Sequence, residues 1–100
     1  MTTSSAIQLS TQEWQRIVQL GVERHIQELE DQLAEAQQEI AQFEGKFGAS
    51  FARLQGTGLP EDASIEAHED YVEWSSWEGR QADLQEQLEK LHAMLRPASA

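Results

Sequence analysis

The sequence predicts an all-α protein: an antiparallel helical hairpin of two long helices that pairs into a four-helix bundle dimer or with a partner protein. The first observation is a stripe of apolar side chains spaced three and four residues apart: Ile26, Leu29, Leu33, Ala36, Ile40, Phe43 and Phe47. The second is a C-terminal stripe with related spacing: Trp77, Leu84, Leu88, Leu91 and Leu95. Stripes this narrow are typical of helices that bury them against another helix.

The boundaries of these elements follow from local signals. Ser10 and Glu13 have the spacing of a capping box, which indicates the start of the first helix. Gly45 and Gly48 lie on either side of Phe47, and a glycine in such a place commonly supplies the left-handed residue that ends a helix. Asp62 or Ser64 caps the second helix. The predicted parts are a flexible tail at 1–9, one hairpin domain at 10–96 with helices at about 11–45 and 63–95 and a connector at about 46–62, and a tail at 97–100.

The connector contains apolar residues that predict packing against the rest of the chain. Gly56, Gly58 and Pro60 interrupt helical periodicity within five residues. Phe51, Leu54 and Leu59 are large and apolar. We therefore expect the connector to fold back over the end of the hairpin.

The strongly acidic composition limits the class of partner. The chain has 18 Asp and Glu against 7 Lys and Arg, a formal charge of −11. This charge disfavours nucleic acid and anionic membranes, which bind clustered basic residues, and it suits a small basic protein. The alternative is that the charge serves solubility alone. With no cysteine, no signal-peptide pattern and no long apolar run, the expected location is the cytoplasm.

The segment from His68 to Trp74, followed by Trp77, is the densest cluster of functional side chains. Aromatic residues bordered by acids are typical of a protein-binding surface. The candidate partner-binding residues are Glu66, Asp70, Tyr71, Glu73, Trp74 and Trp77. Alternatively, the aromatic residues fill the hairpin core. Both hold if Trp77 lies inside and Trp74 lies partly outside.

Metal-binding and catalytic patterns are weak. Glu89 and His92 have the Glu-x-x-His spacing of di-iron helical bundles, as do Glu28 and His25 in the reverse order. Ligands of such bundles project into the core, whereas these residues flank the apolar stripes. No nucleophile–base pair or phosphate-binding loop is recognisable. We therefore expect no enzyme activity and no metal or other cofactor.

Two local patterns go beyond helical periodicity. The segment Phe43–Phe51 is similar to an aromatic–Gly–Met–Ser/Thr–aromatic helix end, with Ala49 in place of Met, and His68–Trp74 is similar to a His-x-Asp-Tyr-x-Glu-Trp pattern. Together they resemble a family of small acidic helical prokaryotic proteins that act as antitoxins in toxin–antitoxin modules. The resemblance covers about residues 40–78. It implies that Tyr71, Glu73 and Trp74 belong to the core or to the partner-binding face.

Three functions remain open at this point. The first is a non-catalytic, antitoxin-like interaction module that covers a small basic, toxin-like protein. The second is a self-assembling coiled-coil or helical-bundle protein, a homo-oligomer whose acidic surface keeps it soluble. The third is a di-iron type metal bundle.

Overall fold

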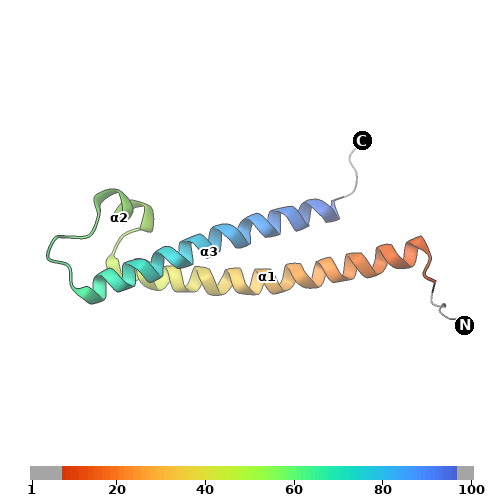
Figure 1. Cartoon of the computed structure of the whole chain (residues 1–100), viewed down its shortest axis with the longest axis horizontal. Helices are drawn as coiled ribbons and strands as arrows, with labels where there is room; N and C mark the ends of the chain where they lie inside the picture. Colours follow the sequence, from red (N-terminus) through yellow and green to blue (C-terminus); the bar gives the residue numbers. More distant parts are fainter. Residues whose placement is uncertain (1–7, 97–100) are drawn as a thin grey trace, which may run out of the picture.

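The computed structural model describes residues 8–96, which contain three helices and no strand. The helices are α1 (Thr11–Phe47), α2 (Phe51–Thr57) and α3 (Ile65–Leu95), and α1 and α3 are the long ones (Figure 1). The all-α prediction is therefore confirmed for this range. Residues 1–7 and 97–100, which make up most of the predicted tails, lie outside the described residues.

The start of α1 is fixed by the predicted capping box. The Glu13 backbone N–H donates to the Ser10 hydroxyl oxygen at 3.1 Å, and the Ser10 backbone N–H donates to the Glu13 carboxylate at 2.8 Å. Two backbone donors near the helix start thereby gain partners within one turn of chain.

The end of α1 lies at Phe47, slightly later than the predicted end at about residue 45. Gly45 remains helical, and Gly48 adopts the left-handed conformation, with φ +67°. The Gly48 backbone N–H donates to the Glu44 carbonyl oxygen at 2.8 Å. Glycine is suited to this position because a Cβ atom makes positive φ unfavourable.

Helices α1 and α3 lie side by side and run in opposite directions (Figure 1). Their shared core consists of buried aliphatic side chains from both helices: Ile26, Leu29, Ala36, Leu84 and Leu88. Half-buried residues pack around it, including Leu33 and Leu91. The two apolar stripes identified in the sequence therefore contact each other.

A second, aromatic cluster closes the end of the molecule where α2 lies. Ile40, Phe43 and Trp74 are buried there, and Phe47, Phe51, Leu54 and Trp77 pack against them. The expected folding back of the connector is confirmed for Phe51 and Leu54. The connector also contains the helix α2, which Ser50 caps by accepting from the Arg53 N–H at 3.1 Å.

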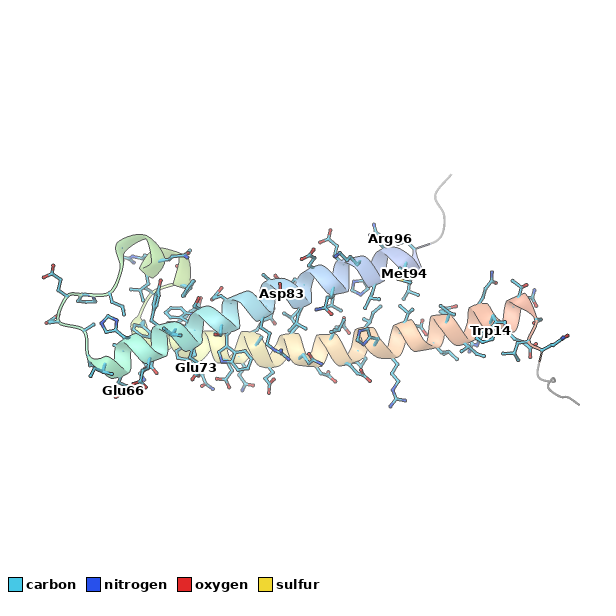
Figure 2. The ribbon with its side chains drawn as sticks, viewed as in Figure 1. Trp14, Glu66, Glu73, Asp83, Met94 and Arg96 are labelled. Atoms are coloured by element: carbon cyan, nitrogen blue, oxygen red, sulfur yellow. The ribbon has the colours of Figure 1, made fainter. Side chains whose placement is uncertain are left out.

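The opposite end is open. Every residue from Thr11 to Gly21 is exposed, and we call this segment the overhang. In Figure 1, α3 ends short of the start of α1, and the two helices diverge toward this end. Figure 2 shows Trp14 on the overhang and Met94 near the end of α3 on the same side of the molecule. Within residues 8–96, the first turns of α1 thus have no other helix against them.

Within residues 8–96, none of the helices combines the length and the apolar character needed to cross a bilayer.

Candidate partner-binding site

Trp74, a predicted partner-binding residue, lies in the core. Its side chain is fully buried, with stacked rings of Phe43 and Phe47 at centroid distances of 5.9 and 5.3 Å and the ring of Phe51 edge-on at 5.2 Å. The indole N–H donates to the Glu78 carboxylate at 3.1 Å, which satisfies its one polar atom. The prediction that Trp74 lies partly outside is wrong, because three phenylalanine rings from α1 and α2 enclose it.

The other two predicted aromatic residues are half-buried. Tyr71 stacks on Phe51 at a centroid distance of 5.3 Å. Trp77 packs against both core clusters and keeps some exposed surface. The predicted arrangement, with Trp77 inside and Trp74 partly outside, is therefore reversed in depth.

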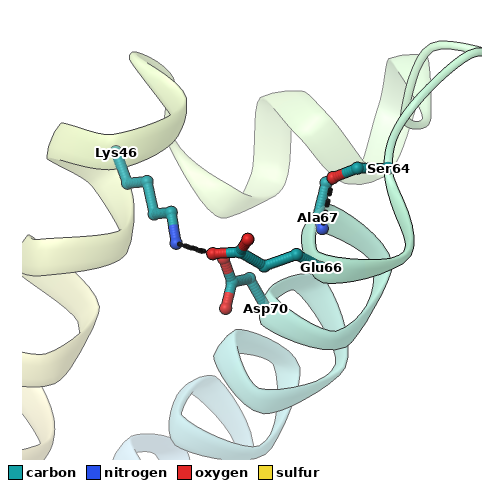
Figure 3. A network of polar contacts seen from close by, with 5 residues as sticks. All are labelled: Lys46, Ser64, Glu66, Ala67 and Asp70. Atoms are coloured by element: carbon teal, nitrogen blue, oxygen red, sulfur yellow. Dashed lines mark hydrogen bonds and ion pairs between the residues drawn. The ribbon is translucent and has the colours of Figure 1, made fainter.

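Two of the predicted acidic residues form a polar link between α1 and α3. The Lys46 ammonium group contacts the Glu66 carboxylate at 3.4 Å and forms a hydrogen-bonded ion pair with Asp70 (Figure 3). The hydrogen bond to Asp70 raises the pKa of Lys46 above its ordinary value of 10.5. Ser64 caps α3 beside this link, because its hydroxyl accepts from the Ala67 N–H at 3.0 Å. Glu66 and Asp70 therefore join the helices.

The exposed side of the first turns of α3 carries a surface that we call the outer strip. It is a shallow depression formed by Ile65, His68, Glu69, Val72 and Glu73. Ile65 is 78% exposed and Val72 is 66% exposed, so both apolar side chains face solvent. At 100° per residue, the strip lies on the side of α3 opposite Trp74. Of the predicted site residues, only Glu73 belongs to it.

The outer strip is strongly acidic. The sequence has no Lys or Arg between Arg53 and Arg80. Among residues 8–96, the ion pairs involve neither Glu69 nor Glu73, whereas Glu66 and Asp70 share Lys46. The two unpaired carboxylates flank the apolar surface of Ile65 and Val72, which gives the strip both negative charge and an apolar centre.

Ile65 and Val72 were not identified from the sequence. Their separation of seven residues places them on one side of a helix. That separation could have identified the pair from the sequence. The prediction followed the aromatic residues around Trp74 instead, which lie on the other side of the helix. The structure distinguishes the two sides of α3: the aromatic side chains pack against α1 and α2, and the small aliphatic side chains lie on the exposed side.

The residues considered for metal binding lie on the surface. His25 Nδ1 is 3.7 Å from the Glu28 carboxylate, and both side chains are more than half exposed. Glu89 and His92 are also exposed. Within the part of the chain that the structure describes, no three His, Asp or Glu residues are grouped so as to hold a metal ion.

Comparisons with known proteins gave no significant match to a protein-family model, a curated protein or a solved structure.

Proposed function

We propose that the chain is a helical hairpin that acts as a non-catalytic protein–protein interaction module and binds a small basic protein through the outer strip. The observation that carries the proposal is the exposure of Ile65 and Val72 between the carboxylates of Glu69 and Glu73. Protein-binding surfaces commonly combine an apolar centre with charges at the rim. The centre supplies affinity, and the rim supplies orientation and the rate of encounter.

The charge of the whole chain supports a basic partner. A formal charge of −11 on 100 residues produces a negative field that accelerates encounter with a positively charged surface. Because Glu69 and Glu73 form no ion pair within residues 8–96, a partner's Lys or Arg meets carboxylates that have no internal cation to displace. The resemblance of residues 40–78 to antitoxins makes a toxin-like protein the partner that we propose.

Two features of the resembling segment support this proposal, because they hold the start of α3 in place. Trp74 and the phenylalanine rings around it hold α2 and the start of α3 together. The Lys46 link fixes the start of α3 against the end of α1. The outer strip is thereby presented on a helix that is packed on its inner side, so that binding requires little ordering of the backbone.

The test is co-expression with small basic proteins encoded beside this chain, followed by co-purification. The binding variant reverses two charges of the strip, Glu69→Lys with Glu73→Lys. The control variant reverses two exposed charges farther along the same helix, Asp83→Lys with Glu89→Lys. Both variants change the net charge equally, so a difference between them reports the position of the charges.

We expect the wild-type chain and the control variant to retain the basic protein and the binding variant to lose it. Val72→Ser should weaken the complex without changing charge. Equal retention by both charge variants would place the binding surface elsewhere, and failure of every neighbouring basic protein to bind would contradict the proposed function. Trp74→Ala is unsuitable as a binding test because Trp74 is part of the core.

A further inference from the structure

The overhang of α1 continues the core-facing side of the helix beyond the point where α3 ends. Among residues 8–96, four of the seven large hydrophobic side chains that are most exposed lie on it: Trp14 (55%), Ile17 (48%), Val18 (53%) and Leu20 (49%). At 100° per residue, Trp14 and Val18 point to the same side of α1 as the core residues Leu29 and Ala36. The helix thus presents a surface of the kind that it buries elsewhere.

A groove lies where α3 ends beside the overhang. Its apolar lining comes from Trp14, Val18 and Val22 on α1 and from Met94 and Leu95 on α3. Val22 and Leu95 also pack against the aliphatic core of the molecule. The groove is therefore continuous with that core, and an apolar helix placed in it would extend the existing packing.

The distribution of charge identifies what fits this groove. Within the first 25 residues, the two acidic side chains, Glu13 and Glu23, are balanced by two basic ones, Arg16 and Arg24. The formal charge of −11 therefore lies entirely on the remainder of the chain. A basic protein gains nothing from a neutral segment. Two copies of the chain repel each other through their acidic remainders, but the neutral segments can approach without this electrostatic repulsion.

We propose that the overhang pairs with the overhang of a second copy of this chain in an antiparallel homodimer. In this arrangement the partner's overhang runs in the same direction as α3 and lies against the side of α1 that carries Trp14 and Val18. The contact is isologous, as in most homodimers, because each copy offers the same segment. The proposal does not rest on the function assigned to the outer strip.

The shape of the overhang sets the register of the pair. Gly21 has no neighbouring atom within 4 Å of where a Cβ would stand, so the space beside it is open. A two-fold axis between positions 17 and 18 places Trp14 of each copy opposite Gly21 of the other. The largest side chain of the segment then meets its smallest residue, and the Ile17 and Val18 side chains meet near the axis.

Sedimentation velocity tests the proposal with a matched pair of valine variants. The contact is short and hence weak, so the protein is measured from about 5 to 500 μM. Val18→Glu places a charge in the proposed contact, and Val72→Glu places one on the outer strip. Both valines are exposed, at 53% and 66%, so neither change disturbs the core. Circular dichroism verifies that both variants remain helical.

We expect the wild-type chain and Val72→Glu to shift from monomer to dimer over this range, and Val18→Glu to associate at least about tenfold more weakly. A wild-type chain that stays monomeric at the highest concentration would overturn the proposal. Association of Val18→Glu equal to that of the wild type would overturn it as well, and loss of association in Val72→Glu would move the contact to the outer strip.

Cysteine cross-linking tests the direction of the pair independently, because the natural sequence contains no cysteine. In the antiparallel register, two Val18→Cys thiols meet at the axis, whereas two Thr11→Cys thiols are about 20 Å apart along the helices. Mild oxidation should therefore cross-link Val18→Cys and leave Thr11→Cys as a monomer. Equally rapid cross-linking of Thr11→Cys would indicate a parallel pair and contradict the antiparallel one.

Discussion

The two ends of the molecule contain similar residues in opposite environments. At the end closed by α2, Trp74 is fully buried among three phenylalanine rings contributed by α1 and α2. At the open end, Trp14 is 55% exposed, and no second helix among the described residues covers it. The difference shows that apolar content does not decide burial. A helix face becomes core where the chain returns to it, and it stays a surface where the chain does not.

The largest expected difference in the free energy of unfolding is between alanine substitutions of the two tryptophans. Trp74→Ala removes a fully buried ring and should lower the free energy of unfolding by about 3–5 kcal/mol. Trp14→Ala removes a half-exposed ring and should change it by no more than about 0.5 kcal/mol in the monomer. Urea unfolding followed by circular dichroism at low protein concentration measures both. Similar values would mean that the two ends do not differ as described.

Within the aliphatic core, the same contrast should appear along α3. Leu88 is 6% exposed and belongs to the core, whereas Met94 is 64% exposed near the helix end. Leu88→Ala should cost about 2–5 kcal/mol because it leaves a cavity between α1 and α3. Met94→Ala should cost less than about 0.5 kcal/mol. Thermal unfolding of dilute samples compares them, and a large loss in Met94→Ala would show that the end of α3 is packed.

Gly21 within α1 and Gly48 just after its end should respond to alanine with opposite signs. Gly48 has φ +67°, which an alanine adopts only at a cost of about 1–2 kcal/mol. Gly21 is helical with open space around it, so Gly21→Ala should raise the free energy of unfolding by roughly 1 kcal/mol. The comparison requires monomeric protein, since Gly21 also lies in the proposed dimer contact. Destabilisation by Gly21→Ala in the monomer would indicate a neighbour at the open end.

The smallest effects are expected from pH. The hydrogen bond from the Ser10 backbone lowers the pKa of Glu13 from 4.5, so its contribution to stability is present above that value and is lost as acid protonates it. The raised pKa of Lys46 has the opposite sign, so the stability that it contributes is lost as pH rises above 10.5. Comparing the melting temperatures of wild type and Glu13→Gln on either side of pH 4.5 tests the first effect. Unchanged differences would contradict it.

The sequence was most informative where one short segment decides the structure. The capping box of Ser10 and Glu13 depends on neighbours within four residues. The other two helix boundaries were narrowed to two neighbouring candidates each, of which the structure uses Ser64 and Gly48. The contact between the stripes around Leu29 and Leu88 was also predictable, because heptad spacing defines one narrow side of each helix. These features required no knowledge of how the connector folds.

The candidate site was less predictable because it depends on contacts between distant segments. The depth of Trp74 is set by Phe43, Phe47 and Phe51, and helical periodicity does not say how closely those rings enclose it. The link from Lys46 to Asp70 spans 24 positions and forms once α1 and α3 are placed together. The aromatic pattern identified residues that the structure places in the core, whereas Val72 lies on the other side of α3 and is exposed.

The aromatic cluster also has a consequence for how the chain folds. Its members lie between Ile40 and Trp77, so they meet after closure of a short stretch of chain, whereas Val22 and Leu95 must meet across most of the sequence. Short closures cost less conformational entropy. The first native contacts should therefore form around Trp74, and the helices should associate from there toward the N-terminus of α1. In kinetic experiments, substitutions at Phe47 should slow refolding, and substitutions at Leu95 should mainly accelerate unfolding.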